Sequence, residues 1–204
     1  MRPTAFKNII FDLGGVIINI APEKTWESIA QLSGKTISEA KIAYGDLEIF
    51  AHLEEGKISG EEFLHTLSRH TGLRNPQLLE SWNALLLDIP QERIELLLSL
   101  KQKHRTFLLS NTNELHVQAI QAYLKQAYSL KLEDLFEQVF LSNEIKLRKP
   151  YSEIYAHLVA CTNIKPKESV FIDDIKENAL AANSVGIMGL HLNLGEKNVL
   201  DLFR

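Results

Sequence analysis

Short runs of mainly apolar residues recur along the chain, and most of them end in polar residues. The first four runs cover residues 8–12, 107–109, 139–141 and 170–172, and a fifth is expected within residues 187–192. Apolar runs of this length are typical of strands that are buried on both faces of a sheet. The pattern therefore predicts five short, buried strands.

Helical spacing of apolar residues fills most of the intervals between these strands. Helices are expected over residues 90–101, 114–126, 150–159 and 176–185, and Gly186 is a natural end for the last of them. Strands that alternate with helices indicate parallel βαβ units. The predicted fold class is α/β, with a doubly wound, mostly parallel, Rossmann-like sheet flanked by helices.

Residues 19–87 interrupt this alternation because they contain no convincing buried strand. Ser59 and Glu62 have the spacing of a capping box, and Phe63, Leu64 and Leu67 follow as an apolar stripe. The expected organisation is a discontinuous core of residues 1–18 and 88–204, with residues 19–87 inserted as a small helical cap domain beside the end of the first strand.

The composition excludes several classes of partner. The chain has 204 residues, a formal net charge of −4 and a pI of about 6.0, so it lacks the basic field that nucleic acid or anionic lipid would require. Its apolar stretches are far shorter than the ~18 residues of a membrane span. A single cysteine and no signal-like start predict a cytoplasmic protein. A monomer and a weak homodimer both fit.

Polar side chains gather at or just beyond the ends of the predicted strands. In open α/β sheets, ligands bind outside the carboxyl ends of the strands. Each of these residues alone is more often a turn, cap or surface residue, but their joint placement predicts a site. The residues are Asp12, Ser110, Asn111, Lys149, Asp173 and Asp174.

The chemistry of this set favours phosphoryl transfer. Asp12, Asp173 and Asp174 would repel one another unless a hard cation such as Mg²⁺ lay between them. Lys149 and the Ser110 hydroxyl could bind the oxygens of a phosphate. Asp12 could then attack phosphorus and form an aspartyl-phosphate that water hydrolyses. The expected partner is a small phosphorylated metabolite.

Four motifs carry a resemblance to a known family. They are Phe11-Asp12-Leu13-Gly14-Gly15-Val16, residues 108–113, residues 147–150 and residues 170–174. With these motifs in order, the chain resembles the haloacid dehalogenase superfamily of hydrolases, in the branch with a helical cap after the first strand. Within that branch it is similar to α-D-glucose-1-phosphate phosphatase-like proteins.

The resemblance implies a role for each matching residue. Asp12 resembles the nucleophile, which is also a metal ligand. Ser110 and Asn111 resemble the phosphate-binding second motif. Lys149 resembles the cation that holds nucleophile and phosphate together, although Lys146 and Arg148 flank it. The metal would be Mg²⁺, held by Asp12, by the backbone carbonyl of Gly14, by Asp174 and, directly or through water, by Asp173.

Gly14 departs from the family pattern, because most phosphatases of this family carry an aspartate there that protonates the leaving oxygen. Three interpretations stay open. The enzyme is a phosphatase whose leaving group needs little protonation, as in a hexose 1-phosphate; or it is a metal-independent 2-haloacid dehalogenase; or it is a phosphometabolite-binding module with feeble catalysis. Asp173 and Asp174 favour the first, because a dehalogenase needs no metal site.

Several other side chains carry weaker expectations. Trp26 and Trp82 are expected to pack inside the cap. Tyr44 and His52 lie in the cap and are candidates to face substrate. Cys161 is expected to be a small buried apolar residue on a helix.

Overall fold

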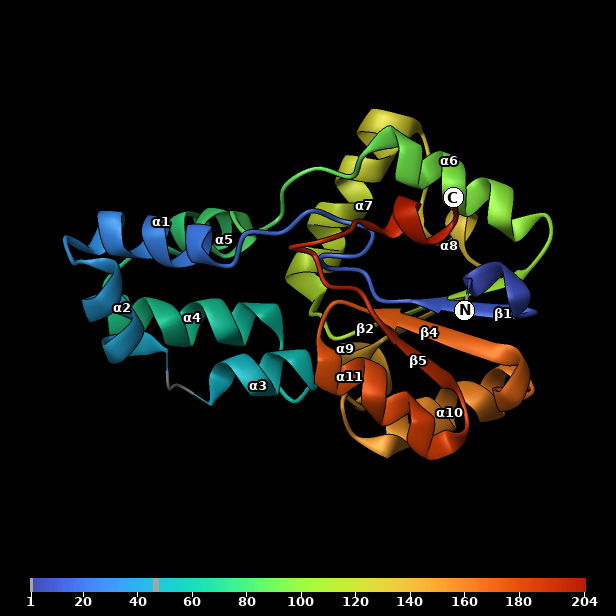
Figure 1. Ribbon diagram of the computed structural model, residues 1–204. Helices are drawn as coiled ribbons and strands as arrows, with labels where there is room; N and C mark the ends of the chain where they lie inside the picture. The colour runs from blue at the N-terminus through green and yellow to red at the C-terminus, as the bar shows by residue number, and fades with distance from the viewer. Residues whose placement is uncertain (1, 46–47) are drawn as a thin grey trace.

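Five strands form one parallel sheet in the computed structural model, which describes residues 2–45 and 48–204 (Figure 1). The order across the sheet is β3-β2-β1-β4-β5, and every neighbouring pair is parallel. The strands are β1 (Asn8–Phe11), β2 (Arg105–Ser110), β3 (Gln138–Leu141), β4 (Ser169–Asp173) and β5 (Met188–His191). The predicted α/β fold with five strands is confirmed.

The strand order places a crevice beside the central strand β1. The chain runs outward from β1 to β2 and β3, then returns to the other side of β1 with β4. In such sheets the point where the order reverses is where ligands bind, outside the carboxyl ends of the strands. Phe11 pairs with Leu108 of β2 and with Ile172 of β4, so the three strands end almost level.

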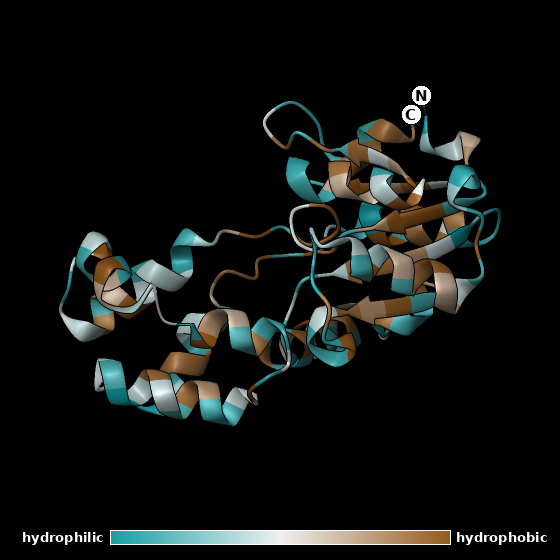
Figure 2. Cartoon of the chain, turned by 90° about the horizontal axis from the view of Figure 1, so that it is seen from below, coloured by the Kyte–Doolittle hydropathy of each residue, from teal (hydrophilic) through white to brown (hydrophobic). Residues whose placement is uncertain are grey.

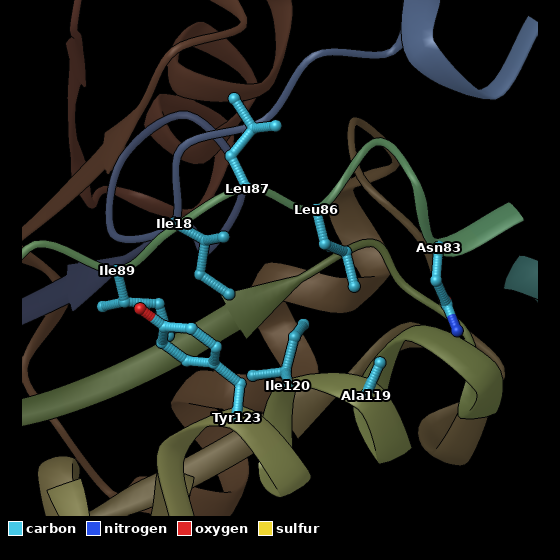
Figure 3. Close-up of a pocket in the computed structure, with 8 residues that line it drawn as sticks. All are labelled: Ile18, Asn83, Leu86, Leu87, Ile89, Ala119, Ile120 and Tyr123. Atoms are coloured by element: carbon cyan, nitrogen blue, oxygen red, sulfur yellow. The ribbon is translucent and has the colours of Figure 1, made fainter. Parts of the chain in front are cut away.

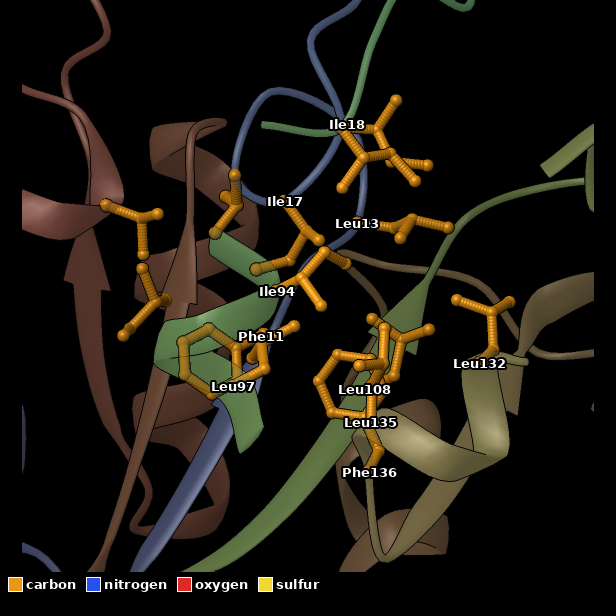
Figure 4. Close-up of a cluster of buried hydrophobic side chains, with 14 of the residues drawn as sticks. Phe11, Leu13, Ile17, Ile18, Ile94, Leu97, Leu108, Leu132, Leu135 and Phe136 are labelled. Carbon is orange, nitrogen blue, oxygen red and sulfur yellow. The ribbon is translucent and has the colours of Figure 1, made fainter. Parts of the chain in front are cut away.

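Helices cover both faces of the sheet. Alternate residues of β1 serve the two faces, because successive side chains of a strand point in opposite directions. Phe11 belongs to the apolar cluster that includes Leu97 and Leu108 (Figure 4), whereas Ile10 packs in a second cluster with Tyr155. In Figure 2 the strands are correspondingly brown, the colour of hydrophobic residues.

The helices of the core follow the predicted positions, with differences at their ends. They are α6 (Gln91–Lys101), α7 (Glu114–Tyr128), α8 (Leu132–Leu135), α9 (Ser142–Ile145), α10 (Ser152–Thr162) and α11 (Lys176–Ala181). The 3₁₀ helices are Pro3–Ala5, Pro166–Glu168, Ala182–Val185 and Val199–Leu202. Pro150 lies two residues before α10 and does not open it. Gly186 ends the 3₁₀ segment with a φ of +84°, as expected for this position.

The described part of residues 23–83, which leaves out residues 46 and 47, contains five helices. They are α1 (Glu23–Ser33), α2 (Ile37–Tyr44), α3 (Ile49–Glu54), α4 (Gly60–Thr71) and α5 (Asn75–Asn83). We call them the helical block. The expected capping box is present at the start of α4, where the Ser59 hydroxyl accepts from the Glu62 amide and Glu62 accepts from the Ser59 amide.

The helical block has its own apolar cluster, which Trp26 and Trp82 join as predicted. Tyr44 is also buried in this cluster, 5% exposed, and does not face a substrate. The expectation that Cys161 is buried was wrong, because this residue of α10 is exposed to solvent. Within the described residues, no helix is long and apolar enough to cross a membrane.

Two chain segments connect the block to the core and pair with each other. The Asn19 amide donates to the Asp88 carbonyl, the Ala21 amide to the Leu85 carbonyl, and the Leu87 amide to the Asn19 carbonyl, each at 2.9 Å. These bonds form a short antiparallel ribbon. The block therefore leaves the core and returns to it at one place, beside the end of β1.

Candidate active site

The sheet brings the polar residues of three strands to one edge. Asp12 directly follows β1, Ser110 ends β2 and Asp173 ends β4, and all three side chains are buried. Since β1 lies between the other two strands, Asp12 occupies the centre of this edge. The site predicted from strand ends therefore coincides with the reversal of strand order.

Lys149 links the nucleophile candidate to the fourth motif. Its Nζ donates to Asp12 Oδ1 at 2.5 Å and to Asp173 Oδ2 at 2.7 Å, and its side chain is 1% exposed. Burial lowers the pKa of Lys149, but the two carboxylates outweigh burial and hold that pKa above its ordinary value. Burial and the charge of Asp173 raise the pKa of Asp12 to about 7, although Lys149 lowers it. The ion pair with Lys149 is the contact that favours the ionised form of Asp12.

Asn111 fixes the backbone that carries Lys149. The side-chain amide of Asn111 donates to the Lys149 carbonyl at 2.9 Å, and its oxygen accepts from the Lys149 amide at 2.8 Å. Both side-chain groups of Asn111 are therefore engaged within the protein. Within the described part of the chain, the Ser110 hydroxyl makes only a long contact, 3.4 Å, with the Asn111 carbonyl, so it can turn to a phosphate oxygen.

Neither neighbour of Lys149 takes its place. Arg148 pairs with Glu54 of the helical block, with 3.2 Å between Nη2 and Oε2. Lys146 ends α9 in the left-handed conformation, with a φ of +57°. Among the described residues, Lys149 alone forms an ion pair with Asp12.

Three carboxylates form a cluster that fits a divalent cation. Oxygens of Asp12, Asp173 and Asp174 all lie within 4.8 Å of one another. Burial and the charge of Asp173 raise the pKa of Asp174, which shows the repulsion that a cation would relieve. Asp173 is already engaged, because its Oδ1 accepts from the Ile175 amide at 2.7 Å and from Asn178 at 3.3 Å.

The loop after β1 leaves a backbone oxygen available beside this cluster. The Gly15 amide donates to the Ile18 carbonyl, and the amides of Ile17 and Ile18 both donate to the Leu13 carbonyl. No group in the described part of the chain donates a hydrogen bond to the Gly14 carbonyl. Carboxylate and carbonyl oxygens are hard donors of the kind that suits Mg²⁺.

Gly15 is needed for the close approach of Asp174. Its φ is +73°, and a Cβ built there would lie 2.5 Å from Asp174 Oδ2. Any side chain at this position would push the Asp174 carboxylate away from the cluster.

A cavity opens between this edge of the sheet and the helical block. Gly14, Ser110 and Asn111 line it from the core, and Glu54 lines it from the end of α3. His116, in the first turn of α7, also lines it. The sequence interpretation missed Glu54 and His116. The position of His116 could have been found, because the first turn of a helix that follows a central strand faces the ligand crevice.

Comparisons with known proteins agree with this geometry. Residues 6–186 match the model of a hydrolase family described as haloacid dehalogenase-like hydrolase. The chain belongs to the haloacid dehalogenase-like hydrolases. It is 28% identical to a D-ribitol-5-phosphate phosphatase from Bacteroides thetaiotaomicron, over 88% of each chain. It is 29% identical to a sesquiterpene phosphatase from Aspergillus oryzae, over 93% of this chain and 91% of the other.

Solved structures of the same family superpose closely. A haloacid dehalogenase family enzyme from Bacteroides thetaiotaomicron is 34% identical, with a TM-score of 0.90 over 98% of this chain and 99% of that chain. The wild-type form of that enzyme has also been solved in complex with magnesium and inorganic phosphate, with a TM-score of 0.84. Dehalogenase structures are 16% identical, with a TM-score of 0.60, and share the fold.

These findings confirm the predicted family. The phosphatases among the relatives agree with the prediction of a phosphoric monoester hydrolase. The magnesium complexes of the similar enzyme agree with the predicted cofactor, which the cluster of Asp12, Asp173 and Asp174 fits.

Proposed function

We propose that the chain is a Mg²⁺-dependent phosphatase that hydrolyses a small phosphomonoester through an aspartyl-phosphate on Asp12. The observation that carries the proposal is the position of Asp12, held by Lys149 and within 4.8 Å of Asp173 and Asp174 at the reversal of strand order. The helical block acts as the cap, with residues 19–87 as the insert and residues 1–18 and 88–204 as the core.

One residue of the site attacks the phosphorus atom, and the others bind the phosphate and balance its charge. Asp12 attacks phosphorus while Lys149 and the Ser110 hydroxyl hold the phosphate oxygens, with the Asn111 backbone beside them. When Mg²⁺ is bound by Asp12, the Gly14 carbonyl and Asp174, it neutralises the charge that builds up on the phosphoryl group. Asp173 supports this arrangement by fixing Lys149 at 2.7 Å.

Dehalogenation and pure binding fit the site less well. Displacement of a halide needs only one carboxylate. A dehalogenase mechanism would therefore give the cluster of Asp12, Asp173 and Asp174 no role as a metal site. A binding module would have no need of a buried carboxylate paired with a buried lysine. The phosphatase accounts for both features.

Two classes of leaving group are candidates. The first is a sugar phosphate such as a hexose 1-phosphate, whose anomeric oxygen leaves readily. The second is the phosphate of an apolar alcohol, because the cavity beside Gly14 is walled by Ile18, Ile20, Leu86 and Ile120. The cavity is about 180 Å³, which favours a small substituent.

A second apolar cavity adjoins the first and supports the apolar alternative. It measures about 190 Å³ and shares Ile18, Leu86 and Ile120 with the cavity at the site. Figure 3 shows these side chains together with Tyr123 around it. A longer hydrocarbon substituent could extend into this space if the side chains between the two cavities rotate.

Phosphate release tests the proposed function. The purified protein with Mg²⁺ is assayed on glucose 1-phosphate, ribitol 5-phosphate and farnesyl phosphate. We expect turnover of at least one ester, its abolition by EDTA, and a loss of about three orders of magnitude or more in Asp12→Asn. Asp134→Asn is the matched control, because Asp134 is exposed on α8.

Two results would contradict the phosphatase. Phosphate release that survives both EDTA and Asp12→Asn would exclude the aspartyl-phosphate route. Chloride release from a 2-chloro acid without metal would identify a dehalogenase instead.

A further inference from the structure

The position where most phosphatases of this family carry a proton-donating aspartate is Gly14 in this protein, and its surroundings are apolar. A Cβ built on Gly14 would lie 3.2 Å from Cδ1 of Ile20. No carboxylate can reach the leaving oxygen from that position. Protonation by a placed acid is worth about 10² to 10⁴-fold in rate, and an ordinary alkoxide leaves slowly without it. Another group must supply the proton if the enzyme hydrolyses esters of ordinary alcohols.

Two ionisable side chains line the cavity that contains Gly14, namely Glu54 and His116. Burial lowers the pKa of His116 to about 4, so its imidazole is neutral near pH 7. Its Nδ1 lies 2.9 Å from Asn83 Oδ1, and its ring stacks on Trp82 with 4.9 Å between centroids. A neutral imidazole is a very weak acid, so His116 does not supply the proton.

Glu54 is held over the site by its backbone. Its carbonyl accepts from the Ser142 hydroxyl at 2.7 Å, and the same hydroxyl accepts from the Thr112 amide at 2.9 Å. Two residues further on, a Cβ at Gly56 would overlap the Asn143 carbonyl. The end of α3 is therefore fixed against the loop that follows β2 and against α9, which follows β3, and Glu54 is presented to the cavity.

The environment of Glu54 favours its protonated form more than water does. Burial raises its pKa, Arg148 and Lys149 oppose the rise, and Glu55 adds to it. Arg148 contacts Oε2 at 3.2 Å and leaves the other oxygen, Oε1, without a hydrogen-bond partner among the described residues. The side chain is 34% exposed, so that oxygen can be reached from the cavity.

We propose that Glu54 is the general acid and base of the reaction and replaces the aspartate that is missing at Gly14. The inference rests on the proposed phosphatase function. In the first step Asp12 forms a bond to phosphorus, the bond from phosphorus to the leaving oxygen breaks, and the Glu54 proton passes to that oxygen. The products of this step are the free alcohol, the aspartyl-phosphate and ionised Glu54.

The second step restores the enzyme. Water attacks phosphorus, Glu54 takes a proton from that water, and the bond between phosphorus and Asp12 breaks. Phosphate is released, Asp12 is again a carboxylate and Glu54 is again protonated. Arg148 is a positioning residue that stabilises the charge of Glu54 between the two steps.

The test compares two esters on Glu54→Gln. Ribitol 5-phosphate needs a protonated leaving oxygen, whereas p-nitrophenyl phosphate releases a stable phenolate without protonation. The quantity compared is kcat/KM, which reports the steps up to release of the alcohol and excludes the later hydrolysis of the aspartyl-phosphate. We expect kcat/KM for ribitol 5-phosphate, or for whichever alkyl ester the wild type hydrolyses best, to fall about 10²-fold or more. We expect kcat/KM for p-nitrophenyl phosphate to change by less than about threefold, which also shows that the variant is folded.

The control and the pH profile separate this role from a structural one. Glu61→Gln changes an exposed carboxylate in the first turn of α4 and leaves kcat/KM for both esters unchanged. In the wild type, kcat/KM for the alkyl ester falls at high pH as Glu54 loses its proton, and Glu54→Gln lacks this fall. Equal losses of kcat/KM on both esters, or no loss on either, would overturn the proposal. A wild type inactive on all esters would contradict the phosphatase function instead.

Discussion

At the scale of single residues, two adjacent glycines shape the site in different ways. The Gly14 carbonyl accepts no hydrogen bond from the residues that the structure describes. Gly14 also has no acidic side chain, and Ile20 lies next to the space that such a side chain would enter. Gly15 adopts a φ of +73° and makes room for the Asp174 carboxylate. The sequence alone identified Gly14 as the departure from the family pattern. It did not reveal that Gly15 is needed for the approach of Asp174, because that contact joins the segment after β1 to the segment after β4.

Substitution of Gly15 tests the metal site. In Gly15→Ala the new Cβ would displace Asp174, so we expect the Mg²⁺ concentration for half-maximal activity to rise about 10-fold or more, the scale of changes around metal ligands. Gly34→Ala is the control, because Gly34 has a φ of +66° and no atom within 4 Å of a new Cβ. The measurement is activity against Mg²⁺ concentration. An equal Mg²⁺ requirement in both variants would contradict the placement of Asp174 as a ligand.

At the scale of elements, periodicity predicted the long helices and the strands but not the short connections. Each strand is buried, so it appears in the sequence as a run of apolar residues. Gly186 ends the last helical segment as expected. The helices α8 and α9 have four residues each, which is too short for a helical repeat to show in the sequence. Of these, α9 begins with Ser142, the residue that fixes Glu54.

The residues of the candidate site could be predicted where they lie at the end of a strand. They could not be predicted where only tertiary contacts bring them to the site. Asp12, Ser110 and Asp173 follow or end strands, so parallel pairing brings them together. Glu54 ends a six-residue helix of the insert, and its nearness to the site depends on how that insert docks. Cys161 was expected to be buried and is exposed. A single small residue on a helix does not indicate which side of the helix faces solvent.

At the scale of the whole molecule, the helical block contacts the core around the cavity. Trp82 of α5 donates to Asn113 at 3.3 Å and stacks on His116, and the Gly60 amide donates to Glu114. Leu115 of α7 joins the apolar cluster of the block. These contacts surround the first turn of α7, so the block and the core meet over the carboxyl ends of β1 and β2 (Figure 1).

This junction makes stability depend on pH. Burial lowers the pKa of His116 from 6.5 to about 4 in the folded protein. The unfolded chain therefore binds a proton more readily between those values, so stability is complete above pH 6.5 and is lost as pH falls toward 4. We expect His116 to account for up to about 3 kcal/mol of that loss.

Chemical denaturation at several pH values measures the effect. His116→Gln is expected to flatten the decline in the free energy of unfolding between pH 6.5 and 4. His65→Gln, at an exposed position of α4, controls for the loss of a histidine. The same slope in both variants would show that His116 is not held neutral at the junction.

The central claim is that Asp12 becomes phosphorylated during turnover, and mass spectrometry of the acid-quenched enzyme tests it most directly. The protein with Mg²⁺ is mixed with the ester that it hydrolyses best, stopped in acid within the first turnover, digested and analysed peptide by peptide. We predict one phosphoryl group on the peptide that contains Asp12 and none in Asp12→Asn. Phosphate release without that modified peptide, or a phosphoryl group on another residue, would contradict the account.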